Sequence, residues 1–288
     1  MLKGLKDISK ELLRAKRVEV ILAYKRASDG VSATPSFVFE EKDIGNLVLD
    51  SYCVHNLSNY IKDFPGEKIG IVAKPCDVKS IVVLLQENQI KRQDLFIIGV
   101  ECRGVIDEKR IHSSDMGFDE KCRTCKSSLP PFCDHLLKDK EKIDTKSEDE
   151  DEYVSIRKLE AKAAAERFKF WQDEFSRCIR CYACRQVCPL CYCPKCVADQ
   201  TMPAWFSKAS SLKGNMAWNI TRAIHLAARC IGCGECERAC PVGIPLMELN
   251  KKIEKDIKEL FGYEAGKNAE QKPFFASFDK NDPDDFIK

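Results

Sequence analysis

Cysteine is the residue type whose number and spacing in this chain suggest a chemical role. It occurs 17 times in 288 residues, and two stretches of the chain space it in the same way. The first stretch carries four cysteines followed by Pro189, namely Cys178, Cys181, Cys184 and Cys188. The second carries four followed by Pro241, namely Cys230, Cys233, Cys236 and Cys240. This C-x2-C-x2-C-x3-C-P spacing is typical of a module that holds two [4Fe–4S] clusters through thiolate sulfurs.

Each cluster is expected to draw its ligands from both stretches. Three cysteines at two-residue gaps wrap one corner of a cubane, and the fourth cysteine of such a run ligates the other cluster. The first cluster is assigned Cys178, Cys181, Cys184 and Cys240. The second is assigned Cys230, Cys233, Cys236 and Cys188. Structural zinc is the alternative, but a four-cysteine zinc site normally uses two CxxC pairs, which this repeat does not resemble.

Three more cysteines follow the first stretch directly, at Cys191, Cys193 and Cys196. Together they could supply most of the ligands of a further metal site. Cys53 and Cys133 are the candidates for its distant fourth ligand. The alternatives are free thiols, thiols that tune the neighbouring clusters, or a zinc site.

The first half of the chain has thiols of its own. Two of them directly follow apolar, strand-like runs at residues 68–73 and 94–100, and the carboxyl ends of parallel strands meet at one edge of a sheet, where sites form. A CxxC pair lies further along. The third cluster predicted here is assigned Cys76, Cys102, Cys122 and Cys125, with Cys133 as the competing ligand. Buried cysteines without a ligand are the alternative.

Composition and charge limit the classes of protein to which the chain could belong. The formal net charge is +2, and no basic stripe indicates a nucleic-acid partner. The chain begins MLKGLKDISKELLRAKR, which lacks the apolar segment of a secretory signal, and apolar runs such as 81–85 are too short to insert into a membrane. We therefore expect a cytoplasmic protein whose cysteines stay reduced.

Apolar periodicity predicts alternating strands and helices in the first half of the chain. Strands are expected at 18–24, 31–40, 68–73 and 94–100, and helices at 4–16, 54–64 and 77–88. This alternation predicts an α/β domain with a mostly parallel sheet. In the second half, helices at 153–175, 215–228 and 245–261 flank the cysteine stretches, which predicts an α+β, ferredoxin-like dicluster module.

These elements suggest four parts. An α/β domain spans 1–137, with a cysteine-rich end, and a charged linker follows at 138–152, for which a solvated helix is the alternative. The dicluster module spans 153–262. The last part, 263–288, is expected to be an extended tail that docks on another surface or stays disordered.

With these motifs in view, the chain resembles the beta subunits of coenzyme F420-reducing hydrogenases and F420-dependent formate dehydrogenases. The resemblance rests on KPCD around Cys76, VEC at Cys102, CRTC from Cys122 and CIRCYACRQVCPLCYC from Cys178. It covers about residues 65–135 and 175–245. It implies an FAD beside the iron–sulfur clusters, and electron transfer between a catalytic partner and a deazaflavin.

Two functions follow. The leading hypothesis is a non-catalytic electron-transfer subunit of an anaerobic formate dehydrogenase, hydrogenase or heterodisulfide-reductase-like complex, relaying single electrons through three or more clusters. The alternative is a flavin-containing, diaphorase-type subunit that itself reduces or oxidises F420 or NAD(P)H. The sequence has no GxGxxG fingerprint and no phosphate-binding loop, which favours the first. A zinc-stabilised interaction module is a third hypothesis.

Overall fold

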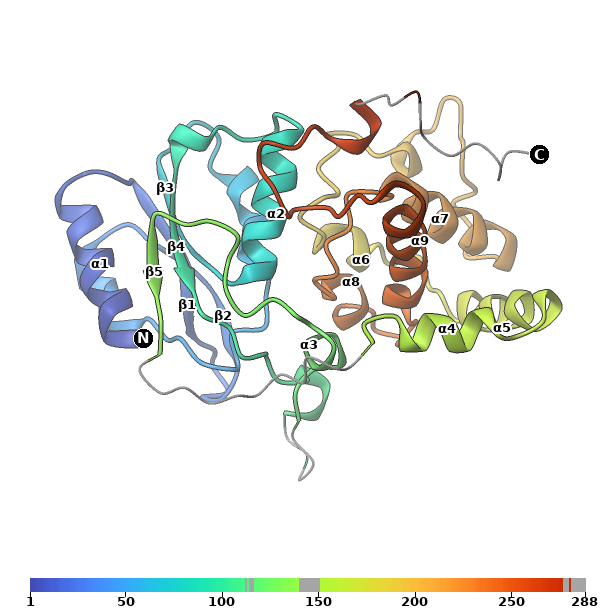
Figure 1. Ribbon diagram of the computed structural model, residues 1–288, viewed down its shortest axis with the longest axis horizontal. Coiled ribbons are helices and arrows are strands. Elements are labelled where there is room, and N and C mark those ends of the chain that lie inside the picture. Colours follow the sequence, from blue (N-terminus) through green and yellow to red (C-terminus); the bar gives the residue numbers. More distant parts are fainter. Residues whose placement is uncertain (112, 114–116, 140–150, 277–279, 281–288) are drawn as a thin grey trace. The chain divides into compact units, whose positions relative to one another are not determined.

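A computed structural model of the chain describes residues 1–111, 113, 117–139, 151–276 and 280 (Figure 1). The chain divides into two compact units. The first comprises Met1–Glu152 and Gly266–Gln271, and the second comprises Tyr153–Ala265 and Lys272–Lys288.

The first unit is built on a five-stranded sheet with the strand order β2-β1-β3-β4-β5. The strands are β1 Val20–Arg26, β2 Ala33–Val38, β3 Ile69–Ala73, β4 Leu95–Val100 and β5 His135–Leu137. Only the β1–β2 pairing is antiparallel, and the β1–β3, β3–β4 and β4–β5 pairings are parallel. The predicted mostly parallel sheet is therefore present. Pro35 lies on the edge strand β2, a position that tolerates the missing N–H.

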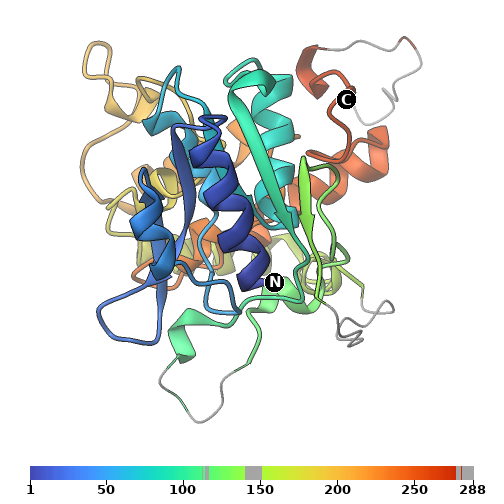
Figure 2. The same cartoon turned by 90° about the vertical axis from the view of Figure 1, so that its left-hand side faces the viewer.

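Helices cover both faces of this sheet. Helix α1 (Leu2–Arg14) lies on one side and α2 (Pro75–Gln86) on the other, as Figures 1 and 2 show. The apolar stripe of α1 is spaced at three and four residues (Leu5, Ile8, Leu12), so one face of the helix is buried. Helix α2 connects β3 to the parallel strand β4, and β3 is buried at all five positions. This βαβ unit forms the centre of the core.

One element of the first unit differs in type from the prediction, and several short elements were not predicted. The segment expected as an α-helix at 54–64 is a 3-10 helix, η2 (Leu57–Asp63). Side chains satisfy its first backbone donors, because Asn56 accepts from Ser58 N at 3.1 Å and Asp77 accepts from Leu57 N at 3.1 Å. Strand β5 was not predicted, since its three residues are too few to show a period. The remaining short elements are η1 Glu41–Asn46, η3 Arg92–Asp94, η4 Glu108–Arg110 and α3 Glu120–Arg123.

All the regular elements described in the second unit are helices. Its helices are α4 Val154–Glu160, α5 Ala164–Ser176, α6 Ala183–Gln186, η5 Val197–Asp199, α7 Leu212–His225, α8 Glu235–Arg238, α9 Leu246–Phe261 and η6 Phe274–Ala276. No strand occurs among the described residues of this unit, which differs from the expected α+β module. The cysteine stretches are instead held by one-turn helices and by contacts with α5, α7 and α9.

The single helix expected at 153–175 is two helices. Helix α4 ends at Glu160, with Ala161 as its C-cap, and a new helix begins where Ala163 N donates to the Glu166 carboxylate at 3.1 Å. This local capping satisfies a donor that a continuous helix would have used, so the break is stable despite the strong helix propensity of the sequence.

Part of the predicted tail packs within the first unit. The amide of Gln86, at the end of α2, donates to the carbonyls of Asn268 and Gln271, both at 2.8 Å. Of the predicted linker 138–152, residues 140–150 lie outside the described residues.

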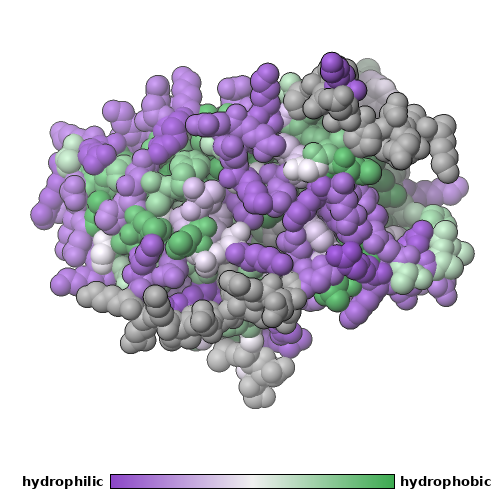
Figure 3. Space-filling view, viewed as in Figure 1, coloured by the Kyte–Doolittle hydropathy of each residue, from purple (hydrophilic) through white to green (hydrophobic). Residues whose placement is uncertain are grey.

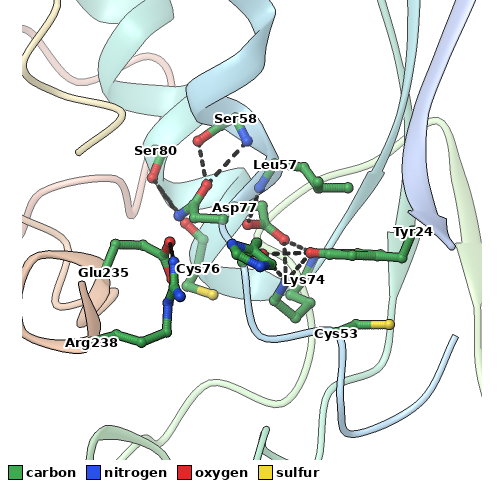
Figure 4. Close-up of polar contacts among 12 residues, drawn as sticks. Tyr24, Cys53, Leu57, Ser58, Lys74, Cys76, Asp77, Ser80, Glu235 and Arg238 are labelled. Atoms are coloured by element: carbon green, nitrogen blue, oxygen red, sulfur yellow. Dashed lines mark hydrogen bonds and ion pairs between the residues drawn. The ribbon is translucent and has the colours of Figure 1, made fainter. Parts of the chain in front are cut away.

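A buried ion pair joins β3 to α2 in the first unit. Lys74 Nζ lies 3.1 Å from the Asp77 carboxylate and 2.7 Å from the His55 carbonyl, and it also contacts the Tyr24 hydroxyl (Figure 4). Burial raises the pKa of Tyr24 well above its usual value. Burial lowers the pKa of Lys74, but the Asp77 charge together with Tyr24 and Cys76 more than offsets burial, so the pKa is raised well above its usual value and Lys74 stays charged.

Hydrophilic side chains predominate on the face of the molecule shown in Figure 3, with apolar side chains in small groups among them. Among the described residues, the helices are too short or too polar to cross a bilayer.

The ion pair predicts a large loss of stability on removal of one partner. Asp77→Ala leaves Lys74 as an unpaired buried charge and should lower the free energy of unfolding of the first unit by about 3–5 kcal/mol. Denaturant unfolding followed by circular dichroism measures the change. Glu40→Ala, which breaks the exposed Lys42–Glu40 pair, is the matched control and should have little effect. An equal response of the two variants would contradict the prediction.

Candidate metal centres

The two cysteine stretches adopt the same backbone conformation at equivalent positions. In the first stretch Arg180 and Tyr182 have positive φ angles of 58° and 60°. In the second the equivalent residues are Gly232 and Gly234, with φ angles of 68° and 72°. A one-turn helix, α6 or α8, then follows in each. The sequence repeat is therefore a repeat of structure, in which left-handed residues turn the chain between cysteines.

Glycine adopts this conformation without strain, but arginine and tyrosine do not. The first stretch compensates through long-range contacts of Arg180, whose side chain is buried. Its guanidinium donates to the Gly214 carbonyl at 2.8 Å and to the Ser207 carbonyl at 3.1 Å. It also lies near the rings of Tyr182 and Trp218. These contacts fix a loop that its own backbone preferences would not favour.

The structure brings together the four cysteines assigned to the first cluster. Burial raises the pKa of the Cys184 thiol, and the thiols whose negative charge raises it further are Cys178, Cys240 and Cys181. Cys240 thus lies with the three cysteines of the other stretch. Two N–H donors point at this set, since Ile244 N lies 3.3 Å from Cys240 Sγ and Asn219 Nδ2 lies 3.8 Å from Cys178 Sγ.

The four cysteines assigned to the second cluster line one cavity. They are Cys188, Cys230, Cys233 and Cys236. Apolar side chains, including Leu226 and Met247, form much of the remaining wall. Burial raises the pKa of Cys236 to about 12. Asn250 Nδ2 lies 3.7 Å from the same sulfur, which adds an N–H donor to this set as well.

All eight donors assigned to the two sets are cysteine sulfurs, the ligand type that holds iron–sulfur clusters. Among the described residues, no group of three or more His, Cys, Asp or Glu side chains is placed to hold one metal ion. Four ligands of one zinc ion must all lie about 2.3 Å from a single point. A cubane instead spreads its thiolates over separate iron atoms, so the sulfurs stand further apart. The cavity also contains the buried side chain of Arg222, whose Nε has no hydrogen-bond partner, as expected beside a negatively charged occupant.

The three cysteines of the insert do not converge. The Cys191 thiol donates to Cys188 and holds the pKa of Cys188 well below its usual value. Cys196 lies within hydrogen-bonding reach of Arg185, and Cys193 is exposed. Cys191 thus lies beside the second cysteine set, and the further site predicted on the three insert cysteines stays a prediction.

Three of the predicted ligands in the first unit lie together at the carboxyl edge of the sheet. Cys76 opens α2 directly after β3, and Cys102 follows β4. Burial raises the pKa of Cys76, and the charges of Asp77 and Cys102 raise it further. The Cys122 sulfur accepts a 3.4 Å hydrogen bond from Val105 N. Burial raises the pKa of the Cys122 thiol, and the charge of Cys102 raises it further.

Two cysteines are candidates for the fourth ligand of this site, and the structure places them in different surroundings. Cys125 contacts the Ser127 carbonyl at 3.6 Å, within the same CxxC loop as Cys122. Cys133 instead packs against Gly99 in β4 and against the hydrophobic core. Cys53, the other distant candidate, is 1% exposed inside this core, and burial raises its pKa to about 11.

Sequence reasoning missed the polar residues that face the cysteines. Asn215, Asn219 and Arg222 lie on one buried face of α7. Their spacing of four and three residues, in a helix that leads straight into Cys230, is the signal that could have identified them, because polar side chains on a buried face need partners.

Comparisons with known proteins agree with this geometry. Residues 177–245 match the 4Fe-4S dicluster domain family. The chain is 22% identical to the F420-dependent formate dehydrogenase subunit beta of Methanocaldococcus jannaschii, over 92% of each chain. It is 23% identical to the F420-dependent formate dehydrogenase 1 subunit beta of Methanococcus maripaludis, over 92% of this chain and 90% of that one. The predicted resemblance is confirmed, and the matches support an iron–sulfur electron-transfer subunit.

The burial of these thiols predicts their reactivity. At pH 8 Cys53 is protonated and inaccessible, so iodoacetamide should modify it far more slowly than the exposed Cys193. Mass spectrometry of peptides from the folded, anaerobically purified protein measures both rates. In denaturant the two should react alike. Modification of Cys53 at the rate of Cys193 in the folded protein would contradict its place in the core.

Proposed function

We propose that this chain is the electron-transfer subunit of a formate dehydrogenase or a related anaerobic oxidoreductase, relaying single electrons through two [4Fe–4S] clusters in residues 177–245 and a third in the first unit. The observation that carries the proposal is the crossing of the two cysteine sets, in which Cys240 lies with the first stretch and Cys188 with the second. That exchange is what a dicluster module requires.

Each residue near the thiols has a definite role in this proposal. The eight cysteines hold the iron, and when bound each cluster accepts and gives up one electron at a time. Asn219, Asn250 and the backbone N–H of Ile244 direct donors at three ligand sulfurs, which favours the more negative, reduced state. Phe175, fully buried and stacked on Trp171 at 5.2 Å, packs beside the first set and excludes water from it.

The third cluster is proposed at Cys76, Cys102, Cys122 and Cys125. The proximity of the first three at the sheet edge supports it, as does the KPCD and VEC resemblance. Lys121, whose charge acts on both Cys76 and Cys122, would balance part of the negative charge of four thiolates.

A second candidate function is a flavin-containing subunit that itself exchanges electrons with F420. The names of the two relatives favour it, because both are F420-dependent formate dehydrogenase subunits that align with 92% of this chain. Acid treatment of the anaerobically purified protein separates the candidates. Released FAD would favour the second, and a flavin-free chain with a full complement of iron would favour the first.

The dicluster assignment predicts a specific loss of iron. Cys233→Ser should remove one cluster and lower iron and acid-labile sulfide by about four atoms each per chain, since each cubane holds four of both. The measurement is a colorimetric assay on anaerobically purified protein. Cys193→Ser, which removes an exposed thiol of the same unit, is the matched control and should leave both counts unchanged. An unchanged count for Cys233→Ser, or zinc in place of iron and sulfide, would refute the assignment.

The third site makes a separate prediction. If it holds a cluster, the unmodified chain contains about twelve iron atoms rather than about eight, and Cys102→Ser removes about four of them. Cys133→Ser distinguishes the competing ligand and should remove none, because its thiol packs against Gly99. A count near eight that Cys102→Ser leaves unchanged would limit the iron to the repeat.

A further inference from the structure

Arg222 is a buried arginine in the wall of the cavity that the second cysteine set lines. It lies on α7, and its residue is 4% exposed. The cavity wall includes its side chain together with Cys188, Cys230, Cys233 and Cys236. A guanidinium that stays charged in proteins is thus placed beside four thiols, away from water.

The protein itself supplies few hydrogen-bond partners to the Arg222 guanidinium. Nη2 donates to the Cys184 carbonyl at 2.9 Å, the guanidinium also lies within hydrogen-bonding reach of the Cys191 sulfur, and Nε is buried without a partner. A guanidinium has five N–H donors, and burying an unpaired charge is costly. In the described part of the chain no carboxylate forms an ion pair with Arg222, so its counter-charge must come from the cavity side.

The other charged groups near the cavity do not supply that counter-charge. Glu235 is paired with Arg238, with 2.9 Å between Arg238 Nη2 and the carboxylate. Glu254 accepts a hydrogen bond from the Tyr153 hydroxyl at 3.3 Å, and its charge acts on Cys230. The ionisable groups that act most strongly on Arg222 are instead thiols, namely Cys236, Cys188, Cys191 and Cys184.

We propose that Arg222 is a fixed positive charge that raises the reduction potential of the centre bound in this cavity. The inference rests on the proposed function, because it requires a cluster on these four thiols. A centre that gains an electron becomes more negative, and a nearby charge in a water-poor environment stabilises that state. Arg222 lines the cavity of the second cysteine set and also donates to the Cys184 carbonyl of the first stretch, so it lies between the two sets.

A purely structural role is the competing explanation. In that case Arg222 only anchors the loop at Cys184, and its charge is incidental. The two explanations predict different reduction potentials for two variants of Arg222. Arg222→Lys keeps the charge and loses the planar hydrogen-bonding geometry, whereas Arg222→Gln removes the charge and keeps an amide donor.

The test is a redox titration of the anaerobically purified full chain with dithionite, followed by electron paramagnetic resonance. In Arg222→Gln the equilibrium constant for reduction of one cluster should fall about ten-fold or more, which is a shift of about 59 mV or more to lower potential for a one-electron couple. The other cluster should shift less. Arg222→Lys should stay close to the unmodified protein. Lys213→Gln removes a charge from an exposed position on the same helix and is the matched control, with no shift expected.

Iron and labile sulfide are counted for every variant, which distinguishes failure of the proposed function from failure of the role of Arg222. An unmodified chain without clusters refutes the proposed function. Full iron with unchanged potentials in Arg222→Gln overturns the role of Arg222 alone. If Arg222→Gln fails to hold iron, Arg222→Lys decides. A normal potential in Arg222→Lys supports the proposal, and a lowered one with full iron overturns it. Loss of iron from both variants makes Arg222 a structural residue and also overturns it.

Discussion

Neither set of four thiols is complete within its own stretch of chain, and the second unit depends on this constraint. Three sulfurs of each set are fixed by a short loop, and the fourth must arrive from the other loop, so both loops have to be held in one register. Helix α7 provides the connection. Asn215 on this helix donates to the carbonyls of Phe175 and Cys178 at 3.0 and 2.7 Å, and the helix ends at His225, shortly before Cys230. Helix α7 is thus hydrogen-bonded to the loop of the first stretch and precedes the loop of the second.

In the first unit, the sheet rather than a pair of loops brings together thiols that lie far apart in the sequence. There the thiols follow strand ends, so the parallel register that aligns Ala73 with Gly99 also brings Cys76 and Cys102 to one edge. The buried Lys74–Asp77 pair holds the turn between β3 and α2 in which Cys76 lies. A buried charge pair contributes little net stability compared with apolar packing, but it is intolerant of losing one member. Placement of this thiol therefore depends on a polar contact inside an otherwise apolar core.

Residue spacing alone is enough to predict some features of the cysteine sets and of the sheet. The exchange of Cys188 and Cys240 between the two stretches follows from the motif, and the strands at 68–73 and 94–100 follow from their apolar runs. The break at Ala161 in the predicted helix, the 3-10 form of η2 and the three-residue β5 depend on local capping or on tertiary contacts that a pattern does not contain. The buried positions of Asn219 and Arg222 beside the cysteines were missed for a related reason. A polar residue in a helix is ordinary until the structure shows that the face carrying it is buried.

The two halves of the repeat differ in how their shared backbone shape is achieved. In the second half, glycines at 232 and 234 adopt the left-handed conformation from local preference alone. In the first half, Arg180 and Tyr182 adopt it only with the support of Gly214, Ser207 and Trp218, which lie far along the chain. We therefore expect an order of maturation in the folding chain. The loop at 230–240 can take its final form early, whereas the loop at 178–188 must wait until α7 has docked, so insertion of iron should be sequential rather than simultaneous.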